Sequence, residues 1–173
     1  MVAFSLILGA QSKWMSIFFT PEGNDLRRAQ RQSELSAVIC KDHASQEVLC
    51  PTGSAAARNN SCSTSGCCQV PAMDGLWATP KVIVWHFVFE SYFALVGELE
   101  ENLLLASATL QTISTALAER LGGTGQVATQ LVARPDEALH LATCLLPGGQ
   151  LLIMESPSDR KDLLARSLSA LKS

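Results

Sequence analysis

Charge is scarce in this sequence. Charged residues make up 17% of the 173-residue chain, against about 25% in an average soluble domain. Thirteen Lys and Arg against sixteen Asp and Glu give a formal net charge of −3. Such a weak negative field does not attract nucleic acid or acidic lipid, so both classes of partner are disfavoured. The low charged fraction indicates instead apolar surface that packs against another molecule.

Long hydrophobic runs are also absent. No stretch approaches the ~20 uninterrupted apolar residues that cross a bilayer, and the nearest one, 82–89, is broken by His86. The first ten residues lack the basic start of a secretory signal. The sequence therefore predicts a soluble, intracellular protein.

The cysteines lack the spacing of a metal site or of a secreted framework. Without a secretion signal, free thiols are favoured over disulfides. No Cys-x2-Cys pair occurs, and adjacent Cys67 and Cys68 do not suit a tetrahedral zinc site. His140 and Cys144 are four apart on a predicted helix, but without a second pair a structural role is favoured over metal binding. The six cysteines are Cys40, Cys50, Cys62, Cys67, Cys68 and Cys144.

Catalytic motifs are missing as well. The chain has no Gly-x-Ser-x-Gly, no phosphate-binding Gly-x4-Gly-Lys-Ser/Thr and no His-Glu-x-x-His. Gly123-Thr-Gly125 imitates a dinucleotide-binding turn, but that turn requires a preceding strand, and here the glycines follow a helical pattern. We therefore predict a non-catalytic protein with no cofactor and no metal.

Aromatic residues are present, but only in two short blocks. All ten lie within residues 1–19 or 77–93, and none follows Phe93. Residues 3–8 and 13–19 are predicted to form a hairpin. Residues 81–89 and 92–96 carry the strongest strand signals, as two strands or as one long bent strand.

Leucine dominates after residue 94 and favours helices. Leucines and other apolar residues at three- and four-residue steps predict helices over 103–121 and 135–145, and a last helix from 156 to 171. An earlier helix is expected from Asn24 or Asp25 to Cys40. Its basic residues, Arg27, Arg28, Arg31 and Lys41, are interpreted as a solvated face rather than as a phosphate or lipid-headgroup contact. Short strands are expected at 130–133 and 151–154.

Residues 42–80 are dominated by Ser, Ala, Asn, Gly and Cys. Their few apolar side chains cannot offset the entropy of ordering the segment, so we predict a disordered internal loop. The remaining order of elements predicts a single α+β domain over 1–173, with an antiparallel sheet of about five strands packed with helices.

Several short motifs occur in an order that resembles the small (sigma) subunits of adaptor protein complexes. The motifs after residue 80 are most similar to those of the sigma subunit of the fifth adaptor complex. The long polar segment before Lys81 also resembles that subunit. The motifs are the opening strand Met1–Leu8, Lys13-Trp14, Lys81-Val-Ile-Val84 with Trp85, Tyr92-Phe93 with Ala-Leu-Val96, Glu101-Asn-Leu-Leu-Leu-Ala106, Arg134-Pro-Asp-Glu-Ala138 and Leu146-Pro-Gly-Gly-Gln-Leu-Leu152.

The resemblance implies a longin-like fold and a non-catalytic role in vesicle-mediated protein transport. It implies a cytoplasmic subunit of a heterotetramer, with two large adaptin subunits and one medium subunit, held peripherally on late endosomes or lysosomes. Spastic-paraplegia-type scaffold proteins are further implied partners.

Sigma subunits hold an acidic dileucine sorting signal in an apolar pocket, assisted by a basic residue near the second strand. By position, that pocket corresponds to Ser91, Ser114 and Thr124, which are polar here, and the basic position falls near Ala10 rather than Lys13. An alternative remains open at this stage, a longin-like or roadblock-like regulator of a small GTPase, which would share the arrangement of sheet and helices.

Overall fold

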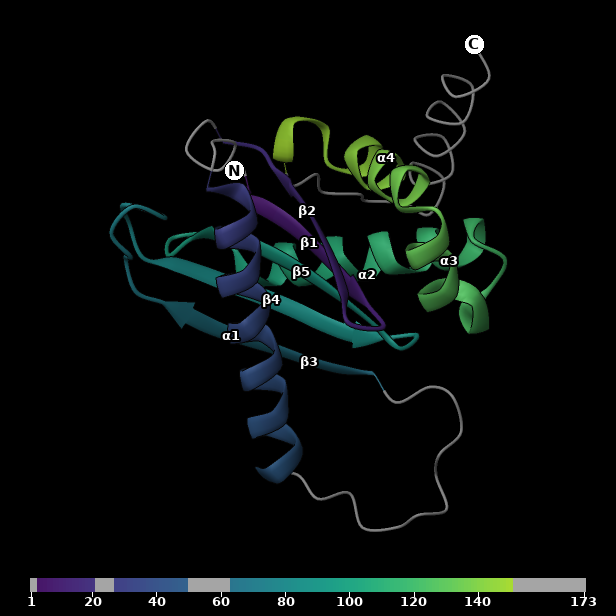
Figure 1. Ribbon diagram of the computed structural model, residues 1–173, viewed down its shortest axis with the longest axis horizontal. Helices are drawn as coiled ribbons and strands as arrows, with labels where there is room; N and C mark the ends of the chain where they lie inside the picture. The colour runs from purple at the N-terminus through teal and green to yellow at the C-terminus, as the bar shows by residue number, and fades with distance from the viewer. Residues whose placement is uncertain (1–2, 21–26, 50–62, 151–173) are drawn as a thin grey trace.

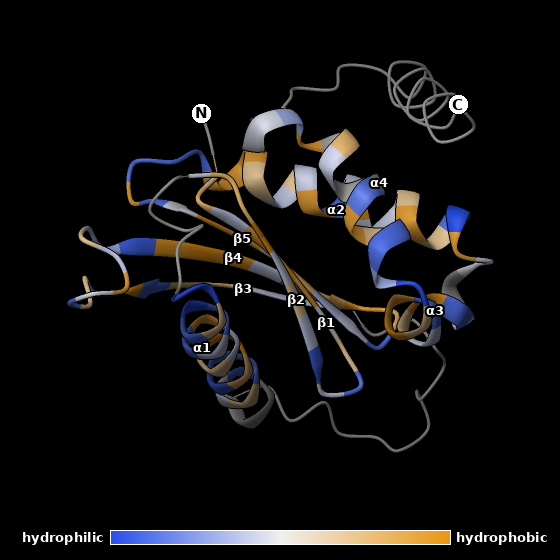
Figure 2. Ribbon diagram, turned by 45° about the horizontal axis from the view of Figure 1, so that its top comes forward, coloured by the Kyte–Doolittle hydropathy of each residue, from blue (hydrophilic) through white to orange (hydrophobic). Residues whose placement is uncertain are grey.

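The computed structural model describes residues 3–20, 27–49 and 63–150. Five strands form one antiparallel sheet in the order β2-β1-β5-β4-β3. Helix α1 lies on one face of the sheet, and α2, α3 and α4 lie on the other (Figures 1 and 2). The α+β prediction with about five strands is confirmed. The elements are β1 Ser5–Ala10, β2 Lys13–Phe18, α1 Arg28–Leu49, β3 Thr64–Val70, β4 Lys81–Val88, β5 Ser91–Glu98, α2 Leu103–Arg120, η2 Thr124–Gln126, α3 Val127–Ala133, α4 Pro135–Leu145 and η3 Pro147–Gly149.

Both aromatic blocks of the sequence form hairpins. Gln11 and Ser12 join β1 to β2, and Phe89 and Glu90 join β4 to β5. All four residues have φ between 49° and 65°, the left-handed conformation that two-residue hairpin turns require. The predicted first hairpin is therefore confirmed, and the second block forms two strands rather than one bent strand.

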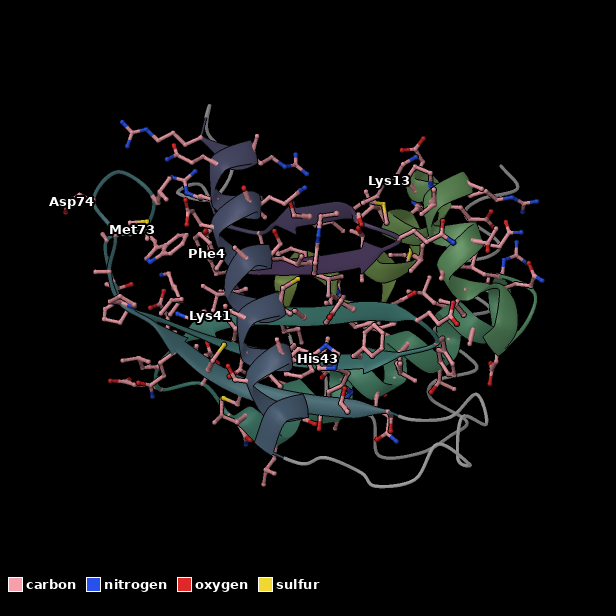
Figure 3. The ribbon with its side chains drawn as sticks, turned by 60° about the horizontal axis from the view of Figure 1, so that its bottom comes forward. Phe4, Lys13, Lys41, His43, Met73 and Asp74 are labelled. Atoms are coloured by element: carbon pink, nitrogen blue, oxygen red, sulfur yellow. The ribbon has the colours of Figure 1, made fainter. Side chains whose placement is uncertain are left out.

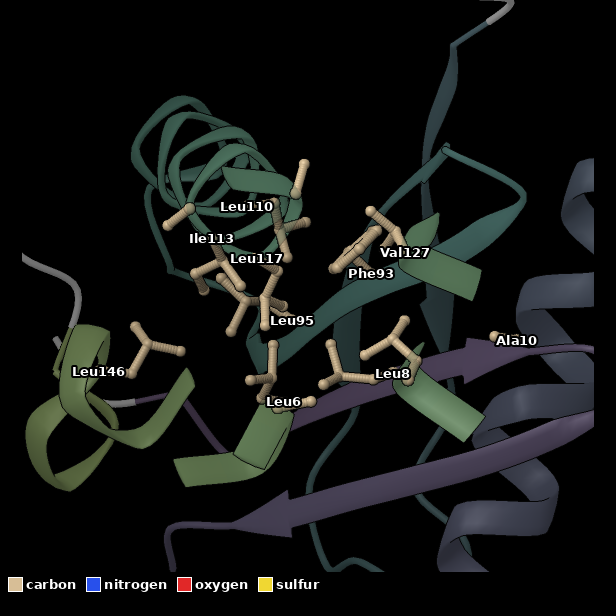
Figure 4. Close-up of a cluster of buried hydrophobic side chains, with 14 of the residues drawn as sticks. Leu6, Leu8, Ala10, Phe93, Leu95, Leu110, Ile113, Leu117, Val127 and Leu146 are labelled. Carbon is tan, nitrogen blue, oxygen red and sulfur yellow. The ribbon is translucent and has the colours of Figure 1, made fainter. Parts of the chain in front are cut away.

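The sheet separates two apolar clusters because successive side chains of a strand point to opposite faces. On the α2 side, Leu6 and Leu8 of β1 and Phe93 of β5 pack against Leu110 and Leu117 of α2 (Figure 4). On the α1 side the cluster is richer in aromatic rings and holds Phe4, Ile7, Phe18, Leu35, Ile39, Val70, Leu76, Trp77, Ile83, Trp85, Ala94 and Val96.

The predicted disordered loop over 42–80 is wrong at 42–49 and 63–80, and residues 50–62 lie outside the described residues. Residues 42–49 continue α1, and residues 64–70 form the edge strand β3. Leu76 and Trp77, in the connection from β3 to β4, are buried. Ordering is favoured because these few apolar side chains enter the cluster on the α1 side.

The strand predicted at 130–133 is also wrong, because residues 127–133 form α3. Val127, Ala128 and Leu131 are buried on one side of this short helix, a spacing that only a helix provides. The predicted helices at 103–121 and 135–145 are confirmed. The strand expected at 151–154 and the helix expected at 156–171 lie outside the described residues.

Candidate functional site

The residues predicted to hold a sorting signal belong to β5, α2 and η2, on the side of the sheet that α2 covers. Ser91, the first residue of β5, is fully buried, and its hydroxyl donates to the Phe89 carbonyl at 3.2 Å. Ser114 in α2 is also buried and donates to the Gln111 carbonyl at 3.1 Å. Thr124 begins η2. Both serine hydroxyls bond carbonyls of their own segments, so binding by these residues stays a prediction.

The structure brings Lys13 close to this region. Ala10 pairs with Lys13 of β2 on one side and with Ser91 of β5 on the other. These three residues therefore form a row across neighbouring strands and share the face on which Phe93 packs. With strands ~4.8 Å apart, Lys13 and Ser91 are separated by about 10 Å at the backbone. Lys13 is exposed at the end of the hairpin (Figure 3).

The interpretation of the basic residues as a solvated face is wrong for Arg31, which is buried, whereas Arg27 and Arg28 are exposed. The buried Arg31 donates from Nε to the Leu76 carbonyl. Arg28 donates to the Ser16 carbonyl of β2, and Arg27 donates to the carbonyl of Gly75. Each of the three guanidinium groups donates to a backbone carbonyl of another segment, so these arginines attach the start of α1 to β2 and to the β3–β4 connection. Lys41 is exposed, as a solvated face predicts.

A polar cluster beneath α1 was missed by the sequence reasoning. His43 is buried between α1 and the sheet (Figure 3). Its Nδ1 lies 2.6 Å from the Tyr92 hydroxyl, and its Nε2 lies 3.0 Å from Thr64 Oγ1. Asp42 accepts a hydrogen bond of 2.8 Å from Trp85 Nε1. The cluster joins α1 to β3, β4 and β5, and the signal for it was the spacing of Leu35, Ile39 and His43 at four-residue steps.

On the opposite face, His86 Nε2 lies 3.0 Å from the Ser107 hydroxyl of α2. Burial lowers the pKa of His86, because the charged imidazolium loses hydration there. This environment between the sheet and α2 therefore favours the neutral form of the imidazole.

A small apolar hollow opens where β5 leads into α2. It is lined by Ala3, which precedes β1, and by residues of β4, β5 and the first turn of α2. Glu101, in the turn before α2, also lines it. Burial raises the pKa of the Glu101 carboxyl, the positive charge of the chain's N-terminus opposes this shift, and the negative charge of Glu98 adds to it. Leu103 lines the hollow and is 40% exposed, and its neighbours in the chain Leu99 and Leu104 are 44% and 84% exposed. The lining residues are Ala3, Val82, Val84, Leu95, Val96, Gly97, Glu101, Leu103 and Ala106.

The thiols and histidines do not assemble a metal centre among the described residues. Cys40, Cys67, Cys68 and Cys144 carry free thiols. His140 and Cys144 share a face of α4, with Nε2 and Sγ 3.5 Å apart. Within the described ranges, no cluster of three or more His, Cys, Asp or Glu side chains is placed to hold a metal ion.

Comparison with known proteins identifies the family. The family model for AP-5 complex subunit sigma-1 matches residues 21–161, most of the chain. The chain belongs to the AP-5 complex subunit sigma-1 family. The predicted resemblance to a sigma subunit of the fifth adaptor complex is thereby confirmed.

A relative within this AP-5 sigma-1 family is known from Homo sapiens. Human AP-5 complex subunit sigma-1 is 36% identical to the chain over 83 residues, which are 48% of this chain and 41% of the human protein. The chain thus matches less than half of its relative's length. None of the helices in the described part of the chain is long and apolar enough to cross a membrane.

Proposed function

We propose that this chain is the non-catalytic small subunit of a heterotetrameric AP-5 adaptor complex in endosomal and lysosomal vesicle-mediated protein transport. Its partners are two large adaptin subunits and one medium subunit, with spastic-paraplegia-type scaffold proteins as further contacts. The observation that carries the proposal is the family match over residues 21–161. The five-stranded sheet with helices on both faces supports it.

In this proposal the protein is cytoplasmic and reaches late endosome and lysosome membranes peripherally, through its partners. The low charged fraction of 17% supports a subunit with large buried interfaces, because the centres of permanent interfaces are depleted in charge.

Affinity purification of the tagged full chain from cells tests this function. We expect two large adaptin chains and one medium chain to be recovered in equal proportion. Recovery of a small GTPase with one longin-like chain, and no adaptins, would instead support the alternative of a GTPase regulator.

We further propose that cargo recognition, if the complex binds acidic dileucine signals, uses Ser91, Ser114 and Thr124 with Lys13 as the basic residue. The row Ser91–Ala10–Lys13 across three strands supports this assignment. A dileucine peptide with an upstream Glu is expected to bind the purified complex and to lose affinity with Lys13→Glu. The matched control is Lys41→Glu, at an exposed lysine on the other side of the sheet. Equal binding by both variants would refute the role of Lys13.

A further inference from the structure

Apolar side chains are exposed together at one place on the surface, the start of α2. Leu99, Leu103 and Leu104 fall within six consecutive residues, in the turn after β5 and the first turn of α2. We call these three residues the leucine ledge. Three of the four large hydrophobic side chains that are exposed among the described residues belong to it. Such a contiguous apolar patch beside a hollow is characteristic of an interaction surface.

Local structure does not require leucines at these positions. Asn102 caps α2, with its side-chain oxygen accepting from the Leu105 amide at 3.1 Å. Helix formation after that cap needs only residues of good helix propensity, which lysine, glutamate or alanine would satisfy. Leu104, at 84% exposed, contributes almost no burial to the fold. Leu104 is therefore apolar for a reason outside the described fold.

The rim of the ledge is acidic. Glu98, Glu100 and Glu101 belong to the same turn, and no Lys or Arg occurs between Lys81 and Arg120. Lys81 forms its ion pair with Glu98. Of the other two glutamates, Glu100 is exposed and Glu101 is half-buried at the hollow. Glu100 and Glu101 therefore place negative charge beside the ledge, and this charge attracts basic side chains.

Glutamates near a helix N-terminus are favoured by the helix dipole even without a partner. The dipole explains the acidic residues but not the leucines. A ligand that is complementary to both the leucines and the glutamates has an apolar side chain next to a positively charged one.

We propose that the leucine ledge is a docking surface for another protein chain of the complex, which contributes a segment with an apolar side chain flanked by Lys or Arg. The apolar side chain packs on Leu103 and Leu104, and the basic side chains meet Glu100 and Glu101. This inference rests on the proposed function, since it requires an assembled complex.

A photo-crosslinking amino acid at Leu104 tests the inference in the intact complex. The variant Leu104→p-benzoylphenylalanine is purified with its partners, irradiated, and mapped by mass spectrometry. Glu119→p-benzoylphenylalanine is the matched control, because Glu119 is exposed on the same helix and ~22 Å farther along its axis. We expect position 104, but not position 119, to crosslink to one partner segment in which an apolar residue lies beside Lys or Arg.

The inference is overturned if the complex is recovered but position 104 crosslinks to residues 151–173 of its own chain, to a second copy, to an acidic or neutral segment, or to nothing. If no adaptin chains are recovered, the proposed function fails as well, so the two failures are distinguishable.

Point substitutions give a second measurement. Leu104→Ser is expected to weaken binding of the crosslinked partner about tenfold, the loss that follows from exposing one buried leucine. Leu104→Met should bind as the natural chain does, and Glu100→Lys should weaken binding more at low salt than at high salt. Because Leu104 and Glu100 are exposed, circular dichroism should show an unchanged fold. Equal binding by Leu104→Ser and Leu104→Met would overturn the inference.

Discussion

The buried ammonium of Lys81 offers a sharp test of what holds β4 to β5. Lys81 is 1% exposed, and it lies directly opposite Glu98 in the β4–β5 pairing. Its Nζ donates to Glu98 Oε1 and, at 2.9 Å, to Thr79 Oγ1, and it lies 4.8 Å from the centre of the Phe4 ring. The substitution Glu98→Gln removes the countercharge while leaving the ammonium in place.

The magnitude follows from burial on the two sides of the pair. A hydrogen bond to a charged group contributes about 1.5–3 kcal/mol, and the 51% exposure of Glu98 reduces that range toward its lower end. We expect Glu98→Gln to lower the free energy of unfolding by about 2 kcal/mol. At ~2–4 °C per kcal/mol for a chain of this size, the melting temperature should fall by roughly 4–8 °C. Lys81→Met/Glu98→Gln should be less destabilised than Glu98→Gln alone, because no unpaired charge stays buried.

The same pair predicts a dependence on pH. Burial raises the pKa of Glu98, but the hydrogen bonds from Lys81 and Thr79 and the charge of Lys81 outweigh it, so the pKa is lowered from 4.5. The carboxylate is therefore ionised more readily in the folded chain. Its stabilisation is fully present above about pH 4.5 and is lost as the pH falls through the lower, folded-state pKa.

Urea unfolding followed by tryptophan fluorescence measures these differences, because Trp77 and Trp85 are buried. Glu100→Gln, at an exposed glutamate of the same turn, is the matched control. Two results would refute the reasoning. One is a Glu98→Gln variant as stable as the control at pH 7, and the other is a double variant that loses as much stability as Glu98→Gln alone, or more.

Three further predictions use the same measurement. Arg31→Met should lower the free energy of unfolding by about 2–3 kcal/mol, because it leaves the Leu76 carbonyl without its buried donor. A loss below about 0.5 kcal/mol would show that this carbonyl has another donor. Leu110→Ala should cost about 2–5 kcal/mol by opening a cavity between α2 and the sheet, and an unchanged midpoint would contradict that packing. His86 has a pKa lowered from 6.5 by burial, so the unfolded chain binds the proton more readily and stability is lost as the pH falls below 6.5. His86→Gln should lose less stability between pH 7.5 and 5.5 than the natural chain, and parallel losses would refute the assignment.

The strongly periodic elements were predictable from the sequence. The segment 103–121 repeats apolar residues at helical steps over its whole length, and the aromatic runs of the hairpins favour strands wherever they occur. These patterns depend only on neighbouring residues, so tertiary contacts were not needed to find them.

Elements held by other kinds of contact were missed. The second half of α1 buries a histidine where a leucine would have continued the pattern, and so it was assigned to a loop. In β3, the position facing Trp85 is Gly66, where a β-carbon would lie 2.5 Å from the indole ring. Glycine and cysteine are poor strand signals, yet the close approach of the ring requires the smallest side chain. Such a requirement comes from a residue nineteen positions away and is invisible locally.

The register of the candidate cargo residues could not be predicted. No local pattern indicates that Lys13, which is displaced from the family's basic position, lies in register with Ala10 and Ser91. Strand register depends on the turn and on the pairing of distant segments, so spacing along the chain could not establish it.

The pairing of β1 with β5 has a consequence for synthesis of the chain. Eighty residues separate Ala10 from Ser91, although the two are partners in the sheet. At about 5–20 residues per second, the ribosome needs roughly 4–16 s to produce the strand that covers the apolar edge of β1. During that time the first hairpin is made without its neighbour, and an uncovered apolar edge is prone to pair with other chains. The order of strands in this sheet therefore leaves the first hairpin of the nascent chain open to mispairing until β5 has been made.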